Sequence, residues 1–211
     1  MKFDFLLAVA HPCESLGRFE ELGRPICYTG LGKINACIAL LSELNHFSTR
    51  GKAPKAVINL GTVGSGDETS GCVMQVVRFV QRDMLCTPLA DEPYKTPLDI
   101  DDPGYIDVAS IPNFLDPVIC GSGDSFVNSD ILKLQTGPKP PWSVVDMEGY
   151  ALARVCRSLD IPFFSIKYVT DSGKVSDWEA MLDSASKTLA TFALLIIERL
   201  KNIPEKQFRQ N

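Results

Sequence analysis

Residues 163–171 read Phe-Phe-Ser-Ile-Lys-Tyr-Val-Thr-Asp, a largely apolar run that ends in a carboxylate. The run lacks the strict alternation of a strand with one solvated face, so it predicts a strand at Phe163–Val169 that is covered on both faces. Asp171 then stands just beyond the carboxyl end of that strand. Open α/β sheets keep their chemistry at this end of their strands, so the stretch predicts both the fold class and the position of a functional acid.

Six further runs of the same kind precede this strand. They predict strands at Phe3–Ala10, Pro25–Thr29, Ala56–Leu60, Val73–Val80, Pro117–Gly121 and Ser143–Val145. Helical periodicity between several of them predicts helices at Lys33–Asn45, Met147–Leu159 and Asp177–Leu200. The last pattern is the strongest, because Ser176 and Asp177 can cap it and Glu179 stands at capping-box spacing from Ser176. Strands that alternate with helices in this way predict an α/β fold.

Composition predicts one globular domain that binds a small molecule. A chain of 211 residues with 45% hydrophobic content is long enough for a single domain over residues 1–211. A formal charge of −5 without a basic cluster argues against a nucleic-acid surface. The apolar N-terminal run is too short for a signal peptide, and no segment is expected to span a membrane. Seven scattered cysteines without a CxxC pair favour a reducing compartment, so we expect a cytoplasmic protein.

Three acidic residues stand where a predicted strand gives way to the next element. Glu14 ends Ala-His-Pro-Cys-Glu, Glu148 lies in Val-Val-Asp-Met-Glu-Gly, and Asp171 lies in Tyr-Val-Thr-Asp-Ser. Carboxylates so placed suit general acid–base chemistry on a neutral substrate. Local sequence leaves other interpretations open: Asp171 can cap a turn, Glu148 can favour a helix N-terminus, and Glu14 can be a surface residue.

Glycine-bearing segments accompany these acids, at Tyr28-Thr-Gly-Leu-Gly-Lys, Asn59-Leu-Gly-Thr-Val-Gly and Gly121-Ser-Gly-Asp-Ser-Phe-Val. Together, acids and glycine turns resemble the purine nucleoside phosphorylase/nucleosidase superfamily, and most closely its hydrolytic branch, the methylthioadenosine/S-adenosylhomocysteine nucleosidases. The resemblance implies a three-layer α/β sandwich around a central, mixed and twisted sheet. It also implies an enzyme that cleaves the N-glycosidic bond of a purine nucleoside with water and without a cofactor.

The resemblance assigns a role to each acid. Asp171 would protonate N7 of the departing purine. Glu148, next to Met147, would accept hydrogen bonds from the sugar hydroxyls and stabilise an oxocarbenium-like transition state. Glu14 would activate water, because the phosphorolytic relatives carry phosphate-binding arginines where this chain has Glu14 and Asn59. Two alternatives remain: phosphorolysis at an atypical phosphate site, and a silent protein that binds nucleosides without turnover.

Other residues match the family's substrate contacts. Phe126 would stack on the base, and the backbone of Val127 would read the purine edge. A turn at residues 62–64 would lie beneath the ribose and the attacking water; its members are Thr62, Val63 and Gly64. Lys167 stands where the nucleosidases carry an arginine near that water. Neither histidine, at positions 11 and 46, has partners at metal-ligand spacing, so no metal is expected.

Two short connections distinguish this chain from the family pattern. Only Ser15–Tyr28 separates the first acid from the next glycine turn, and Ser172–Asp177 is short before the last helix. Both changes predict a more open site for the 5′ substituent, with Leu31 and Trp178 as apolar contacts and tolerance of varied 5′ groups on an adenine nucleoside. The family also implies a homodimer, for which the Pro- and Asp-rich Asp91–Pro117, expected to be a long loop, offers an arm.

Overall fold

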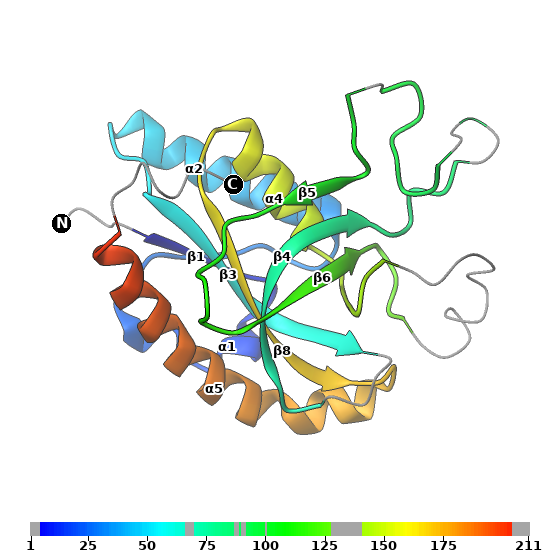
Figure 1. The fold of residues 1–211 in the computed structure, drawn as a ribbon. Helices are drawn as coiled ribbons and strands as arrows, with labels where there is room; N and C mark the ends of the chain where they lie inside the picture. Colours follow the sequence, from blue (N-terminus) through cyan, green and yellow to red (C-terminus); the bar gives the residue numbers. More distant parts are fainter. Residues whose placement is uncertain are drawn as a thin grey trace.

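The computed structural model describes residues 5–65, 70–86, 89, 92–99, 101–127 and 141–203. Within these residues one sheet of eight strands forms the centre of the molecule (Figure 1). The strands are β1 (Phe5–Val9), β2 (Ile26–Tyr28), β3 (Ala56–Ser65), β4 (Val73–Gln81), β5 (Tyr105–Asp107), β6 (Asp116–Ser122), β7 (Val144–Asp146) and β8 (Phe163–Asp171). Part of the N-terminal strand expected at Phe3–Ala10 lies outside the described residues.

The sheet is mixed and curls until it meets itself. β3 runs parallel to β1 and β8, and β8 runs antiparallel to β4. β4 runs parallel to β6, β6 runs parallel to β7, and β7 returns antiparallel to β3 at Gly64 and Ser65. β2 extends the sheet beyond β1, and β5 forms an edge on β4. Because β3, β8, β4, β6 and β7 close a ring, strand ends that are distant in sequence converge on one region.

Helices cover both faces of this sheet (Figure 1). They are α1 (Pro12–Ser15), α2 (Lys33–Thr49), α4 (Gly149–Ser158) and α5 (Val175–Lys201), with a 3-10 turn at Glu20–Leu22. α2 and α4 pack against each other and share a buried core with the sheet, to which Leu40 and Leu152 contribute. α5 packs on β8 and β3 and contacts α1, and it contributes Leu189 and Ile196 to the second core. The predicted α/β architecture with a central mixed sheet is confirmed.

Burial of the central strands agrees with their sequence pattern. All nine residues of β8 are buried, and β3 is buried from Ala56 to Gly61. Apolar strands without alternation therefore do lie between two helix layers, as expected for a sheet covered on both faces. The register places Gly61 of β3 beside Lys167 of β8, which matters for the site described below.

Two expectations about chain segments were wrong. β3 continues to Ser65, so residues 62–64 belong to a strand rather than a turn, and the pairing with β8 shifts register between Val63 and Gly64. The predicted loop Asp91–Pro117 contains β5, which pairs with β4. Sequence pattern did not reveal β5 because three residues are too short to show a period among Asp and Pro.

The C-terminal helix also departs from its predicted form. It begins at Val175 with Lys174 at the N-cap, and no side chain caps it; Ser176 instead donates to the neighbouring carboxylate of Asp177. Among the described residues this helix is long and apolar enough to cross a membrane by length and composition alone, so the expectation that no segment spans a membrane stays a prediction. In the structure its apolar stripe packs against the sheet, which is a sufficient reason for its hydrophobicity.

Candidate active site

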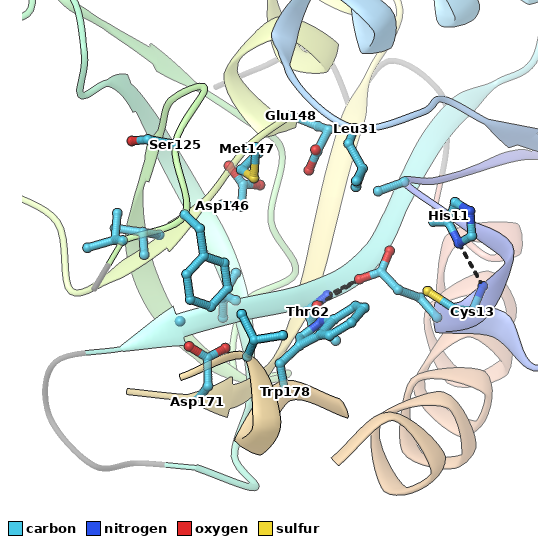
Figure 2. A pocket seen from close by; sticks show the side chains of 18 of the residues that line it. His11, Cys13, Leu31, Thr62, Ser125, Asp146, Met147, Glu148, Asp171 and Trp178 are labelled. Carbon is cyan, nitrogen blue, oxygen red and sulfur yellow. Dashed lines mark hydrogen bonds between the residues drawn. The ribbon is translucent and has the colours of Figure 1, made fainter. Parts of the chain in front are cut away.

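A pocket with a volume of about 380 Å³ opens where the strand ends converge (Figure 2). It is lined by Ala10, His11, Cys13, Glu14, Leu31, Thr62, Val63, Gly64, Arg82, Ser125, Phe126, Val127, Val145, Asp146, Met147, Glu148, Asp171, Val175 and Trp178. Every residue predicted for the site is in this lining except Lys167, which is buried and pairs with the lining residue Asp146. Residues predicted from separate motifs therefore share one cavity.

Glu14 is held by the strand opposite its own helix. Its helix, α1, begins with His11 as N-cap, whose Nδ1 accepts from the Cys13 N–H at 3.2 Å, and with Pro12 in the first turn. Glu14 Oε1 accepts from both the N–H and the hydroxyl of Thr62, each at 2.8 Å. Oε2 is buried and has no hydrogen-bond partner among the described residues. A polar group or water in the pocket is the natural partner for that oxygen, since a buried unpaired acceptor is costly.

Trp178 helps to hold Glu14 through a hydrogen bond to the Thr62 hydroxyl. Its indole Nε1–H donates to the Thr62 hydroxyl oxygen at 3.0 Å, and that hydroxyl donates onward to Glu14. The predicted apolar contact for a 5′ group thus also has a polar function. It fixes the direction of the Thr62 hydroxyl, because an oxygen that accepts from Trp178 keeps its proton for Glu14.

Asp171 is the last residue of β8 and is buried. The hydroxyl of Thr170 donates to Oδ2 at 2.9 Å, and the N–H of Gly173 donates to Oδ1 at 2.8 Å. These donors fix the orientation of the carboxyl group at the end of the pocket. The Thr-Asp pair quoted in the sequence therefore acts as a unit, with the hydroxyl orienting the acid.

Glu148 is the N-cap of α4 rather than its first helical residue. Its Oε1 accepts from the N–H of Gly32 at 2.8 Å, at the start of α2. Gly32 has φ +86°, a conformation that L side chains rarely adopt, so glycine is required there to present this N–H. Burial and the nearby charge of Asp146 raise the pKa of Glu148 to about 7, although the Gly32 N–H and Lys167 pull it down.

Lys167 and Asp146 form an ion pair on the floor of the site. Lys167 Nζ lies 3.0 Å from Asp146 Oδ2, and the two side chains are 3% and 1% exposed. Burial alone would lower the pKa of Lys167, but the charges of Asp146 and neighbouring acids outweigh it and raise the pKa, so the amine is charged. Its predicted role beside the attacking water stays a prediction.

The two ends of the pocket differ in character. Figure 2 shows Asp171 and Ser125 toward one end and His11 and Cys13 toward the other, with Glu148 between them. Phe126 and Val127 follow β6 on the side of Ser125, with Phe126 39% exposed. On the opposite side Leu31 is 58% exposed, so this end is open to solvent.

Sequence reasoning missed two charged residues that line the pocket. Asp146 ends β7 within the quoted Val-Val-Asp-Met-Glu motif, and Arg82 directly follows β4. Arg82 is buried and donates to the Ser125 hydroxyl at 3.0 Å, to the Gly123 carbonyl at 2.9 Å and to the Ser125 carbonyl. Both residues stand at the carboxyl end of a strand, so the same rule that located Asp171 could have located them.

Four buried carboxylates line one cavity, those of Glu14, Asp146, Glu148 and Asp171, and such a cluster supports acid–base chemistry on an organic substrate. In the described ranges, no group of three or more His, Cys, Asp or Glu side chains is arranged to hold a metal ion. The cations around the pocket are engaged by other groups. Lys33 pairs with Asp83 at 2.6 Å, the Arg82 guanidinium is bound to the segment before Phe126, and the buried Lys167, which lies near Glu14, pairs with Asp146. The geometry therefore presents an acceptor-rich site.

Comparison with known proteins identifies the family. A model of the phosphorylase superfamily matches residues 16–198. A 5′-methylthioadenosine/S-adenosylhomocysteine nucleosidase of Geobacillus sp. (strain WCH70) is 28% identical over 211 aligned positions, which cover 90% of this chain and 87% of the relative. One from Haemophilus influenzae (strain PittGG) is 39% identical over 88 residues, 39% of this chain and 38% of the relative.

A solved nucleosidase structure shares the fold. The Helicobacter pylori 5′-methylthioadenosine/S-adenosylhomocysteine nucleosidase, in complex with butyl-thio-DADMe-Immucillin-A, superposes with a TM-score of 0.78. The alignment covers 92% of this chain and 97% of that one, at 18% identity. At that identity the likeness concerns the fold, whereas the family model spans most of the sequence. This chain belongs to the phosphorylase superfamily.

Proposed function

We propose that this protein is a purine-nucleoside N-ribohydrolase that cleaves the N-glycosidic bond of an adenine nucleoside. The observation that carries the proposal is the convergence of Glu14, Glu148 and Asp171 on one pocket, each buried and each held by a specific donor. Relatives at 26–28% identity across most of the chain are named methylthioadenosine/S-adenosylhomocysteine nucleosidases. Their substrates are the first to test here.

Asp171 is the proposed general acid. Its carboxyl group delivers a proton to N7, and the electron pair of the breaking C1′–N9 bond passes to the purine, which then leaves as the neutral base. An adenine base also offers a 6-amino donor to the same carboxyl group. This predicts preference for 6-amino over 6-oxo purines.

Glu148 is the proposed stabiliser of the sugar. Loss of the base leaves positive charge on the ribose ring, and an ionised carboxylate beside it lowers the barrier. Gly32 occupies only Oε1. Glu148 therefore retains acceptor capacity for ribose hydroxyls, with Met147 beside it in the lining.

Glu14 is the proposed base for water. Thr62 fixes Oε1, and the buried Oε2 accepts the proton while the water oxygen forms the new bond to C1′. Because no lysine or arginine side chain of the described residues lines the pocket beside Glu14, a phosphate dianion would lack the bidentate partner that normally recognises it. Hydrolysis is therefore favoured over phosphorolysis.

The deciding experiment is a panel of purine nucleosides scored by release of free base, with and without phosphate. Methylthioadenosine, S-adenosylhomocysteine, adenosine and inosine test the base and the 5′ group together. We expect phosphate-independent adenine release and tolerance at the 5′ position, where Leu31 is exposed. Strict dependence on phosphate would establish phosphorolysis, and no release from any nucleoside would favour a silent binding protein.

A homodimer and a cytoplasmic location are further parts of the proposal. Ile34, Ile38 and Leu41 give α2 an apolar exposed stripe that adjoins Leu31 at the open end of the pocket. Such a stripe is a candidate contact between two copies of the chain, in addition to the arm expected at Asp91–Pro117. Light scattering that gives a monomer with full activity at micromolar concentration would contradict the dimer proposal.

The cytoplasmic location is proposed because seven free cysteines suit a reducing compartment, and cell fractionation tests it.

A further inference from the structure

The buried pair of Asp146 and Lys167 is tied to its surroundings on several sides. Besides the ion pair at 3.0 Å, Asp146 accepts from the Ser122 hydroxyl at 2.6 Å and from the Gly149 N–H at 3.1 Å. A buried ion pair is weak evidence for a stabilising role, because desolvation of both charges offsets their attraction. Its position therefore deserves a functional explanation.

That position is between the reactive acids. Asp146 stands two residues before Glu148, at the point where β7 leads into α4. On the other side, the place where a Cβ of Gly61 would lie is 3.5 Å from Lys167 Nζ and 3.3 Å from Glu14 Oε1. The ammonium group thus lies near two reactive carboxylates while its direct partner is Asp146.

We propose that Asp146 and Lys167 are positioning residues that together set the proton occupancy of Glu148, and with it the pH range in which the ribose contact is ionised. The inference rests on the proposed function, since it gives Glu148 a role that needs the negative charge. Neither residue is required to touch the substrate for this effect. Asp146 accepts from the N–H of Gly149, the residue that follows Glu148, and charges act over distance in a buried site.

The two members of the pair act on Glu148 in opposite directions. The negative charge of Asp146 disfavours a second negative charge nearby, whereas the positive charge of Lys167 favours it. Burial raises the pKa of Glu148 most, Asp146 raises it further, and Lys167 lowers it. Among the described residues, the Gly32 N–H from α2 also lowers the pKa of Glu148, and the charge of Glu14 from α1 raises it.

The test is the position of the acid limb in the pH profile of kcat/KM for base release. Asp146→Asn removes the repulsion and leaves Lys167 in place, so the limb should move to lower pH by about one unit. Lys167→Met removes the attraction and leaves Asp146 in place, so the limb should move to higher pH by a similar amount. The double variant should return it close to the wild-type position.

Matched variants separate charge from structure. Asp107→Asn breaks the partly exposed pair with Arg78, outside the pocket, and should leave the limb where it is. A pair with a purely structural role would reduce the amplitude of the profile without moving the limb. If the limb stays in place in both single variants, or moves the same way in both, the proposal is wrong.

A second measurement does not depend on turnover. The pH dependence of unfolding free energy, compared with and without Glu148→Gln, reports the titration of Glu148 directly. In the Asp146→Asn background, the pH midpoint of the difference in unfolding free energy with and without Glu148→Gln should fall. Because a single substitution leaves a buried charge unpaired and can prevent folding, the double variant provides the folded reference. If no nucleoside is cleaved, an opposite shift of this midpoint in the two backgrounds still supports the charge pair, and its absence overturns it.

Discussion

Replacement of Glu148 by Gln should stabilise the protein at neutral and alkaline pH while it impairs catalysis. The carboxyl pKa lies near 4.5 in an unperturbed glutamate and near 7 in the folded protein. Because the folded pKa is raised, the native state gains stability from the proton below the lower value. It loses that stability as pH rises toward and through the upper one. Gln keeps an oxygen for the Gly32 N–H but carries no charge, so it escapes this loss.

The expected magnitude follows from the two pKa values. Their separation corresponds to about 3 kcal/mol at full ionisation, since each unit is worth ~1.4 kcal/mol. Between about pH 5.5 and about pH 8, roughly 2 kcal/mol of this should appear. The lower limit avoids the sequence pI of about 5.1, where solubility is lowest.

Urea unfolding followed by circular dichroism at several pH values measures this effect. The unfolding free energy of Glu148→Gln minus that of the parent should increase with pH across the interval. A parallel assay of base release should show both a higher KM and a lower kcat, because one group makes the sugar contact and stabilises the charge. Unfolding free energies that differ by the same amount at every pH would refute the reasoning.

Three other substitutions test the remaining roles. Asp171→Asn should lower kcat roughly 10²–10⁴-fold in a folded protein, as measured by adenine release, because the amide cannot deliver the proton. Glu14→Gln retains an oxygen for Thr62 but removes the base, so single-turnover hydrolysis should slow while equilibrium binding of a nucleoside changes little. Arg82→Lys loses the fork that holds Gly123 and Ser125, the residues just before Phe126, so titration should show about ten-fold weaker nucleoside binding together with a lower Tm. Tight binding by the lysine variant would contradict that role.

The sequence was sufficient for the fold class and most of the lining because those signals are local. An apolar strand followed by an acid marks both the strand and its functional end, as at Asp171. Closure of the ring depends on the pairing of Gly64 and Ser65 in β3 with β7. The two strands are far apart in sequence, so no local pattern predicts that they pair. The position of Arg82 just after β4 is a local signal that could have marked it, but its contacts with Gly123 and Ser125, some forty residues away, could not be predicted from sequence.

Lys167 illustrates the limit of strand periodicity. Alternation places Lys167 and Tyr168 on opposite faces of β8, but all of β8 is buried, so the pattern does not say which face holds the site. Only the register with Gly61 brings the lysine beneath Glu14, and only the ring brings Asp146 to it. Asp146, the partner of Lys167, stands in the same sequence motif as Glu148, yet its contact with Lys167 arises only in the folded structure.

The glycine segments acquire a clearer meaning from these distances. Gly61 leaves space where a Cβ would be 3.3 Å from Glu14 and 3.5 Å from Lys167, and Gly32 presents its N–H to Glu148 from a positive φ. Both glycines stand in motifs that suggested turns, yet each determines how closely a backbone approaches a carboxylate. The spacing among the three acids is therefore encoded as much by residues without side chains as by the acids. A search for titratable groups alone would find Glu14, Glu148 and Asp171 but would not explain why they fit around one pocket.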